Sequence, residues 1–262
     1  MGRISIKKAI LLGLASVLDE AIDWWEVATC PYLCLKHDKV KKHSIANAVS
    51  DLLKTGYIEK KIKKNGAVVF RITSQGKTKI VYDIPLARFT GKKWDGIWRL
   101  VSFDVPEKKA RVRASLRRKL RELGFGMLQE SLWVTPHDLG EKLEQFLEEE
   151  NLKDYCVVWE GKRVFGENEK ELARKVWNLD KLHEKYLDFI SEGKNDRREF
   201  ISKCEELLKD KKEILKRKEE WEGEYFQLLA SDPGLPRELL PDDWLFERAR
   251  QLFNKLRNIS HT

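Results

Sequence analysis

The stretch Trp94-Asp-Gly-Ile-Trp-Arg-Leu-Val-Ser-Phe-Asp-Val-Pro-Glu107 organises the middle of this sequence. Residues 98–103 alternate between apolar and polar side chains, which predicts a strand that is buried on one face. Pro106 suits the first turn of a helix, where its missing N–H costs no hydrogen bond. That helix carries an apolar stripe made of Val112, Leu116, Leu120 and Leu123.

The downstream residues continue this alternation of elements. Residues 125–136 predict a second strand region that resembles a broken hairpin, residues 139–150 a helix, and residues 155–160 a further strand. The order strand, helix, strands, helix, strand is that of a ferredoxin-like α+β unit. We therefore predict a ferredoxin-like domain over residues 89–168.

The preceding residues predict a winged helix-turn-helix over residues 1–88. The helix His43–Lys54 has Ser44 as its N-cap and Gly56 as its stop, and its apolar residues recur at helical spacing: Ile45, Val49, Leu52 and Leu53. Two β-rich runs, 57–62 and 67–72, flank Lys63-Lys64-Asn65-Gly66, and Asn-Gly between such runs is a strong hairpin signal. A Thr-x-x-Gly step, Thr73 to Gly76, leads into the next helix.

The basic charge of the chain lies in this N-terminal third. Residues 1–88 carry 16 Lys and Arg against 8 Asp and Glu, whereas the rest of the chain is close to balanced. A locally basic module suits a polyanion, because neutralised phosphates release counterions. The base-reading candidates on the polar side of the helix are Ser44, Asn47 and Ser50. The candidates for contacts with the DNA backbone are Lys41, Lys42, Lys54, Lys63, Lys64 and Arg71.

Residues 169–262 are expected to be helical. One apolar stripe consists of Leu179, Leu182, Tyr186 and Ile190, and another of Phe200, Cys204 and Leu208, with a turn between them at Ser191–Asn195. The charged stretch 209–220 is interpreted as a solvated helix. The closing helix has its own apolar face, formed by Ala249, Leu252, Phe253 and Leu256. The fold class is therefore multidomain α+β, with a helical third part.

Other features have two interpretations each. Asp104, between strand and helix, suits a helix cap, and its alternative role is as a metal ligand in a nuclease. Cys30, Cys34, His37 and His43 have ligand types for zinc, but their spacing fits no common finger. The basic face of the helix after Pro106 is either a solvated surface or a contact for phosphate or coenzyme A. Arg3, Lys7 and Lys8 before an apolar run resemble a secretion signal, but a first helix in a cytoplasmic protein fits the interruptions by Gly13 and Ser16 better.

The sequence resembles the PaaX-like family of transcriptional repressors. The resemblance is carried by Trp94-Asp-Gly-x-Trp-Arg-Leu-Val-x-Phe, Arg117-Arg-x-Leu-x-x-Leu-Gly-Phe-Gly126, Leu132-Trp-Val-Thr-Pro136 and Asp232-Pro-x-Leu-Pro-x-Glu-Leu-Leu-Pro-x-Asp-Trp244. The central part is in turn similar to the ferredoxin-fold nuclease of CRISPR adaptation, in which an Asp at the place of Asp104 binds metal. No second carboxylate or His near Asp104 in the sequence completes a metal site.

The resemblance implies a repressor that binds double-stranded operator DNA as a homodimer and releases it when an acyl-CoA effector binds. It places dimerisation or effector binding in residues 169–262, and it implies no catalytic residue, no metal and no resident cofactor. The family pattern implies arginines where this chain has Ala46 and Asp51, so a different operator is expected. Two alternatives remain: a metal-dependent nuclease that uses Asp104, and a nucleic-acid-binding scaffold without a ligand.

Overall fold

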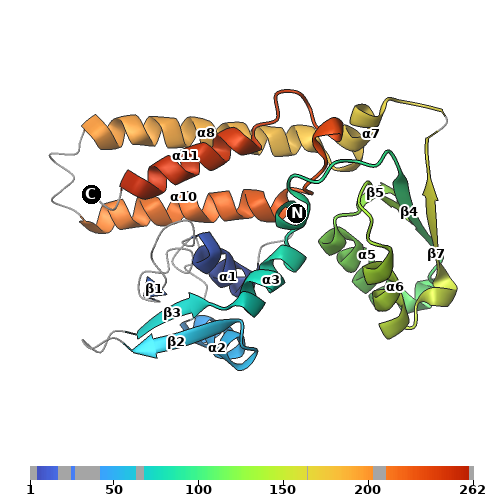
Figure 1. The fold of residues 1–262 in the computed structure, drawn as a ribbon, viewed down its shortest axis with the longest axis horizontal. Coiled ribbons are helices and arrows are strands. Elements are labelled where there is room, and N and C mark those ends of the chain that lie inside the picture. Colours follow the sequence, from blue (N-terminus) through green and yellow to red (C-terminus); the bar gives the residue numbers. More distant parts are fainter. Residues whose placement is uncertain are drawn as a thin grey trace. The chain divides into compact units, whose positions relative to one another are not determined.

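The computed structural model describes residues 5–16, 25–26, 42–62, 68–163, 165–202 and 211–259. These residues form helices and two antiparallel sheets, so the predicted α+β class is confirmed (Figure 1). The chain divides into two compact units that are each discontinuous in sequence. The first unit comprises residues 1–82, 183–231 and 245–262, and the second comprises residues 83–182 and 232–244. The predicted division into three consecutive domains stays a prediction.

The first unit contains a small sheet and two groups of helices. Its N-terminal elements are α1 (Ile6–Ser16), β1 (Trp25–Glu26), α2 (Lys42–Lys54), β2 (Ile58–Ile62), β3 (Val68–Ile72) and α3 (Ser74–Asp83). Its other elements are α10 (Lys211–Ser231), α11 (Phe246–Ile259) and the part of α8 (Leu179–Ser202) from residue 183 onward. The strand order is β1-β3-β2, and every pairing is antiparallel.

Helix α1 lies against several other elements of the first unit. It contacts α2, β3 and α10. Its buried residues are Ala9, Ile10, Leu11, Leu12 and Leu14, of which Ala9 is fully enclosed. This apolar run therefore serves as core, in agreement with its interpretation as part of a first helix.

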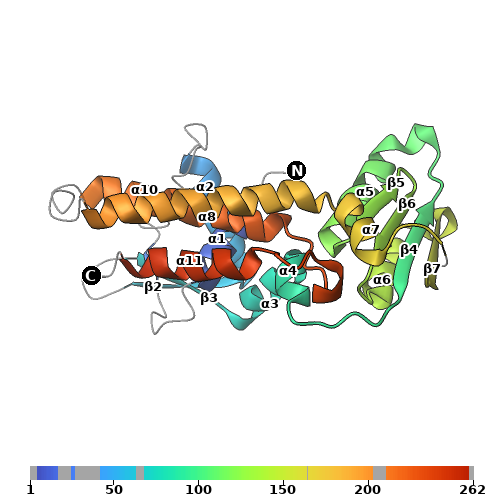
Figure 2. The same cartoon turned by 90° about the horizontal axis from the view of Figure 1, so that it is seen from above.

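The long helices of the first unit pack through aromatic rings. Phe189 of α8 lies 5.7 Å from Tyr225 of α10, and Tyr225 stacks on Phe253 of α11 with ring centroids 4.1 Å apart. Figures 1 and 2 both show these three helices running alongside one another. The stripe predicted for α8 is confirmed, since Leu179, Leu182, Tyr186 and Ile190 are all buried.

The predicted turn at Ser191–Asn195 is wrong. Helix α8 continues through these residues to Ser202. Gly193 within it is buried, so the packing of the helix outweighs the roughly 1 kcal/mol that an interior glycine costs. The second predicted stripe, Phe200, Cys204 and Leu208, lies outside the residues whose side chains are described.

The second unit is built on a four-stranded antiparallel sheet. Its first elements are α4 (Pro85–Phe89), β4 (Trp98–Phe103), a 3-10 turn (Glu107–Lys109), α5 (Ala110–Leu123), β5 (Gly126–Gln129) and β6 (Leu132–Thr135). They are followed by α6 (Gly140–Glu149), a 3-10 turn (Lys153–Tyr155), β7 (Cys156–Gly161), α7 (Glu169–Val176) and a 3-10 turn (Arg237–Leu239). The strand order is β5-β6-β4-β7, and β5 carries a bulge between Met127 and Gln129. The predicted order of strands and helices is confirmed.

Each face of this sheet has its own hydrophobic core. Val101, Phe103 and Trp133 face α5 and α6, where they pack with the stripe of α5 at Leu116, Leu120 and Leu123. Trp98 and Val134 face the other way and pack with Ala173 of α7 and with the C-terminal residues Leu235, Leu239 and Leu240. Alternation along the strands places neighbouring residues on opposite faces, so both sides of the sheet are used for packing.

The Trp94-to-Arg99 signature fixes the start of β4. Asp95 accepts a hydrogen bond from the Ile97 backbone N–H and forms an ion pair of 2.7 Å with Arg99. The Arg99 guanidinium also lies 2.8 Å from Glu160 on β7. These two carboxylates raise the pKa of Arg99, with the hydrogen bond to Asp95 as the largest cause. Asp95 and Arg99 of this signature therefore have a structural role, since they pair with each other and Arg99 also pairs with Glu160.

The C-terminal signature Asp232-Pro-Gly-Leu235 has a similar structural role. Asp232 is buried and accepts a hydrogen bond of 2.8 Å from the backbone N–H of Gly234. Gly234 has a φ of +65°, and a Cβ there would lie 2.7 Å from the backbone of Leu86. Glycine is needed at this position, because the segment lies directly on α4.

Candidate nucleic-acid interface

Helix α2 presents a polar face to solvent. Ala48, Val49 and Leu52 are buried, whereas Asn47, Ser50 and Lys54 are exposed. At about 100° of rotation per residue, the three exposed side chains fall within about 60° of one another. The predicted polar side of this helix is therefore the side that is open to a partner.

Ser44 occupies a different place from the one predicted. Helix α2 begins at Lys42, so Ser44 lies within its first turn and is not the N-cap. Ser44 is exposed and lies about 20° around the helix from Asp51, at the edge of the polar face. Lys42 belongs to α2, but its side chain lies outside the described set, and the whole of Lys41 does so too.

The C-terminal end of α2 is closed by a glycine, as predicted. Gly56 has a φ of +69°. Its N–H donates to the Leu53 carbonyl at 3.0 Å, and the Tyr57 N–H donates to the Leu52 carbonyl at 3.0 Å. This pair of hydrogen bonds is the Schellman arrangement, which satisfies carbonyls that the end of a helix leaves free. The chain thereby turns directly from α2 into β2.

The Thr73-to-Gly76 step joins the hairpin to this turn. The Thr73 hydroxyl donates to the Gly56 carbonyl at 2.6 Å, and it accepts a hydrogen bond of 3.1 Å from the Gly76 N–H. A Cβ on Gly76 would lie 2.1 Å from the Tyr57 carbonyl oxygen. Threonine and glycine therefore fix the start of α3 against the end of α2, and they set the position of α2 relative to the strands.

The acidic residue of α2 is paired within the protein. Asp51 is half-buried, and its carboxylate lies 2.7 Å from Lys7 Nζ of α1. The hydrogen bond from Lys7 is the largest cause that lowers the pKa of Asp51, and the charges of Lys7 and Lys54 lower it further. Asp51 is therefore ionised at neutral pH, but its charge is balanced by α1.

The hairpin adds cationic side chains that the sequence reasoning did not single out. Lys60 and Lys61 on β2 are both exposed. One residue, Ile62, separates them from the predicted tip lysines, Lys63 and Lys64, which lie outside the described residues. The sequence could have indicated these two lysines, because a Lys-Lys pair near a basic turn adds to the positive charge of the hairpin.

Arg71 is less available than predicted. It lies directly opposite Glu59 in the β2–β3 register, and its Nε is 2.5 Å from the Glu59 carboxylate. Arg71 is half-buried. Its charge is therefore partly compensated by a carboxylate on the neighbouring strand.

Asp104 does not cap the helix that follows it. Its side chain is exposed at the end of β4, and its backbone N–H donates to the Tyr155 carbonyl at 2.9 Å. A 3-10 turn begins at Glu107 after Pro106, so α5 starts only at Ala110, and neither start has a side-chain cap. The capping interpretation is therefore wrong, because the intervening turn places the helix too far along the chain.

A catalytic role for Asp104 gains no further residues from the structure. Within the described ranges, no group of three His, Cys, Asp or Glu side chains is placed to hold a metal ion. Cys156 is half-buried, and burial raises the pKa of its thiol to about 11, so it is protonated at neutral pH. The predicted Cys/His set falls outside the described residues apart from His43, whose side chain is also outside them.

The basic face of α5 is partly engaged by its own unit. Lys119 lies 5.4 Å from the Phe146 ring centroid, and Arg121 lies 5.3 Å from that of Trp133. Arg117 pairs with Glu130 at 3.5 Å. Arg111 and Arg118 are exposed. Whether this face also contacts phosphate or coenzyme A stays a prediction.

None of the helices in the described ranges is long and apolar enough to cross a membrane.

Comparison with family models gives two matches. The model described as the PaaX protein central Cas2-like domain matches residues 91–173. The model described as the PaaX-like protein C-terminal domain matches residues 177–261. Together they cover more than half of the chain and fall on the parts that carry the signatures.

Comparison with individual proteins agrees with the family models. The transcriptional repressor PaaX of Escherichia coli (strain K12) is 26% identical over 191 residues, which cover 70% of this chain and 55% of that protein. The chain thus spans little more than half the length of this relative. The uncharacterized protein Rv0674 from Mycobacterium tuberculosis has a similar fold, with a TM-score of 0.58 at 18% identity, over 98% of this chain and 96% of that one.

Proposed function

Because the chain belongs to the PaaX-like family, we propose that it is a DNA-binding transcriptional repressor whose first 88 residues form a winged helix-turn-helix. The relative from Escherichia coli is named a transcriptional repressor, and repression by such a protein requires contact with DNA. The observation that carries the proposal is the polar face of α2, which is exposed beside a lysine-bearing hairpin.

The shape and chemistry of α2 suit the major groove. An α-helix fits the width of that groove, where each base pair presents its own pattern of donors and acceptors. Asn47 lies in the middle of the exposed face, and an amide can bond to adenine in a bidentate manner. Ser44 and Ser50 are the other candidates for base contacts.

The cations around α2 suit the phosphate backbone. Lys54 is exposed at the end of the same face, and Lys60 and Lys61 are exposed on the hairpin. We propose that these lysines, together with Lys41, Lys42, Lys63 and Lys64, neutralise phosphates and so position the helix. Arg71 contributes less in this proposal, since Glu59 compensates its charge.

The remaining parts of the proposal rest on the family. We propose that the protein acts in the cytoplasm as a homodimer on a palindromic operator, because two-fold operators mirror two-fold proteins. Residues 169–262 then supply dimerisation or effector contacts, and an acyl-CoA thioester is the proposed effector. We assign the four-stranded unit to the ferredoxin-like class, supported by its order of elements and its strand order β5-β6-β4-β7.

Selection of bound duplexes from a random pool tests the proposal. We expect the protein to enrich a palindromic sequence at low ionic strength, and its affinity to fall steeply with salt. Asn47→Ala should relax the preference at one position of each half-site, at a cost of about 1–3 kcal/mol. Lys181→Gln, which alters an exposed lysine of α8, is the control and should leave the preference unchanged. Failure to retain any duplex would contradict the proposal.

The proposal also assigns binding and not catalysis to this chain. Incubation of a labelled duplex with Mg²⁺ or Mn²⁺ should leave it intact. Metal-dependent cleavage that is lost in Asp104→Ala would instead favour the nuclease. Tight operator binding that no acyl-CoA thioester weakens would favour the scaffold without a ligand.

A further inference from the structure

Helix α5 of the second unit is rich in arginine. Five of its six cationic residues are arginine, whereas 33 of the 51 Lys and Arg residues of the whole chain are lysine. A guanidinium group can hold two oxygens of a phosphate or carboxylate at once, whereas the lysine ammonium acts as a point charge. The composition of α5 therefore favours a bound anion. Its arginines are Arg111, Arg113, Arg117, Arg118 and Arg121.

Three of these arginines surround a small exposed residue, Ala114. Arg111, Arg117 and Arg118 lie three or four positions from Ala114, and residues at that spacing are neighbours on the surface of a helix. Arg111 and Arg118 are exposed, and Arg117 is half-buried. The methyl group of Ala114 leaves space between them, so an anion can approach three guanidinium groups together. We call Arg111, Arg117 and Arg118 around Ala114 the arginine patch.

The cations of α5 repel one another in the free protein. Arg113, Arg117 and Arg121 follow each other at intervals of four residues, and like charges at this spacing destabilise a helix. Glu122 is the one acidic residue of α5, so the helix itself compensates little of this repulsion. A bound polyanion would remove it.

Carboxylates of the protein leave the patch mostly uncompensated. Among the described residues, none lies within ion-pair distance of Arg111 or Arg118, and Arg118 donates to the Ser115 hydroxyl at 3.2 Å. Arg117 lies 3.5 Å from Glu130, whose side chain is 88% exposed, and such surface pairs contribute little. Arginines elsewhere in the described chain do form ion pairs, namely Arg71, Arg99, Arg163, Arg174 and Arg250.

The neighbouring helix α6 is acidic, but it lies on another side of α5. It carries four glutamates and one lysine. Lys119 of α5 lies 5.4 Å from the ring centroid of Phe146 of α6, and Lys119 is about 140° around the helix from Ala114. Helix α6 therefore meets α5 away from the arginine patch, and its glutamates leave the patch open to a partner.

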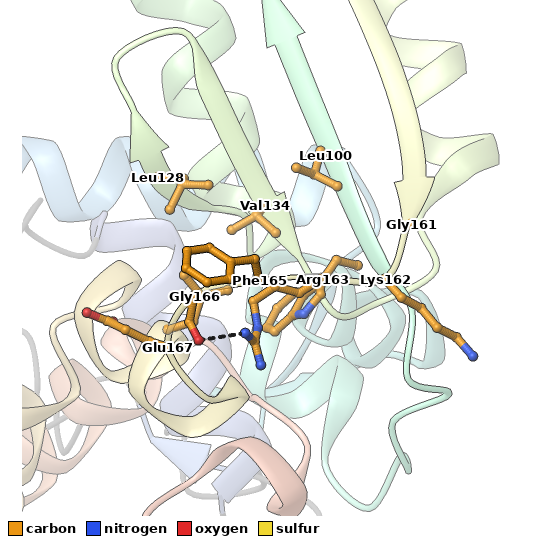
Figure 3. Close-up of a pocket in the computed structure, with 11 residues that line it drawn as sticks. Leu100, Leu128, Val134, Gly161, Lys162, Arg163, Phe165, Gly166 and Glu167 are labelled. Carbon is orange, nitrogen blue, oxygen red and sulfur yellow. Dashed lines mark hydrogen bonds between the residues drawn. The ribbon is translucent and has the colours of Figure 1, made fainter.

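The opposite face of the sheet has a different character. A pocket of about 380 Å³ lies there, and Leu100, Leu128 and Val134 give it an apolar lining (Figure 3). Arg163, which also lines this pocket, pairs with Glu169. The side of the unit that carries α5 is therefore the better one for a phosphate-bearing partner.

We propose that the arginine patch of α5 binds the phosphate backbone of duplex DNA without regard to base sequence. The proposal rests on the DNA-binding function proposed above, and it adds a second contact that belongs to the other compact unit. A duplex carries one negative charge for about every 1.7 Å of its axis, a density that suits a cluster of guanidinium groups. Contacts of this kind position a protein on DNA but read no bases.

The salt dependence of binding to a labelled duplex of mixed sequence tests the proposal. Arg111→Gln combined with Arg118→Gln should weaken binding about tenfold and reduce the slope of log K against log salt by about 2, since each phosphate contact contributes about 0.9. Arg111→Lys combined with Arg118→Lys keeps both charges and should keep the slope.

A matched control removes two charges from the same unit. Lys170→Gln combined with Lys175→Gln alters two exposed lysines of α7 whose charges are already paired with carboxylates. This variant should bind as the wild type does. Circular dichroism of every variant verifies that the fold is kept.

Photocrosslinking tests the place of the contact. With p-benzoylphenylalanine in place of Ala114, the protein should form a covalent link to the same duplex on irradiation. With p-benzoylphenylalanine in place of Gln145, which is exposed on α6, it should not. A structural role of the arginines alone would give no such difference.

The outcomes separate this inference from the proposed function. A wild-type slope in the Arg111→Gln, Arg118→Gln variant, or equal crosslinking from positions 114 and 145, overturns the inference and leaves an acidic protein as the partner that α5 fits. Selection from a random pool should give this variant the same palindrome as the wild type, whereas Asn47→Ala changes the preference. A wild-type protein that retains no duplex at all overturns both proposals.

Discussion

Lys7 of α1 and Asp51 of α2 form an ion pair of 2.7 Å. The two residues are 44 positions apart in sequence. The pair neutralises the one acidic residue of α2, whose side chain is half-exposed at the edge of the polar face. An unpaired carboxylate at this place would repel the phosphates of a bound duplex. Neutralisation by α1 therefore allows an acidic residue in a helix that we propose to enter the major groove.

The first prediction concerns this pair. Lys7→Met leaves Asp51 uncompensated, and we expect it to weaken duplex binding about tenfold, which corresponds to about 1.4 kcal/mol. Lys7→Met combined with Asp51→Asn should recover most of the loss. Fluorescence anisotropy with a labelled operator measures both, with Lys181→Gln as the variant of equal charge change. A loss in Lys7→Met no larger than that in Lys181→Gln would show that Asp51 lies far from phosphate.

The pH dependence of the pair has a definite sign. Because the folded pKa of Asp51 is lowered, the ionised carboxylate stabilises the folded protein above the unfolded pKa. That contribution is lost as the pH falls through the folded pKa. Asp51→Asn should therefore remove a small part of the acid destabilisation, and urea unfolding at a series of acidic pH values measures it.

The second prediction concerns Lys54. Lys54 is exposed on the polar face of α2, and we propose that it contacts one phosphate. Lys54→Gln should weaken binding to all duplexes to a similar degree and should reduce the slope of log K against log salt by about 1. Binding measured over a range of salt concentrations gives the slope. An unchanged slope would show that Lys54 does not contact the DNA backbone.

The third prediction concerns Gly76. A methyl group there would lie 2.1 Å from the Tyr57 carbonyl oxygen, which belongs to the backbone and cannot move away as a flexible side chain can. Gly76→Ala should lower the free energy of unfolding by about 3 kcal/mol, in the upper range of overpacking effects. Gly140→Ala is the control, since the nearest atom to its Cβ is 3.8 Å away. Thermal unfolding followed by circular dichroism compares the two, and equal melting temperatures would contradict the close approach.

The fourth prediction concerns His137, a buried histidine in the second unit. Its ring stacks on Phe89 with centroids 3.4 Å apart and is 4% exposed. Burial lowers the pKa of His137 to about 3, and the charges of Lys92, Arg88 and Arg99 add to this, against a backbone hydrogen bond with Gly234. The neutral ring is therefore part of the folded state.

The sign follows from this shift. Below pH 6.5, the ordinary pKa of histidine, His137 binds a proton in the unfolded chain but stays neutral in the folded chain. Stability should thus be full above pH 6.5 and fall by up to about 1.4 kcal/mol per pH unit as the pH drops towards 3. Chemical unfolding between pH 7 and 4 measures the slope, and His137→Gln should flatten it. A variant with the same slope as the wild type would show that other groups cause the loss.

Periodicity predicted the parts of the fold that repeat regularly. The polar side of α2 at Asn47, Ser50 and Lys54 and the buried stripe of α8 were predictable because each helical turn sorts residues by polarity. The succession of strands and helices in the second unit was predictable for the same reason, since each element has its own spacing of apolar residues. The start of α2 at Lys42 and the helical course of Ser191–Asn195 were not predictable, because local signals there favour a cap and a turn, whereas packing decides the outcome.

The contacts that define the sites depend on tertiary structure. Lys7 and Asp51 meet only because α1 packs on α2, and Glu59 reaches Arg71 only in the observed strand register. A pocket of the second unit is lined by residues from three strands and from the segment after β7, among them Phe165. No spacing within the sequence marks Leu100, Leu128 and Val134 as neighbours, since they come from three different strands.

The uninterrupted course of α8 has a consequence for any attempt to dissect the protein. Its first turn, with Leu179 and Leu182, belongs to one compact unit, and Tyr186, Phe189 and Ile190 further along belong to the other. Helix α1 in turn contacts α10, so a fragment that ends near residue 88 would expose apolar surface that the C-terminal half normally covers. We expect such a fragment to aggregate or to bind DNA poorly, even if every DNA-contacting residue is present. Genetic or proteolytic removal of residues after 88 would thus damage the fold of the first unit itself.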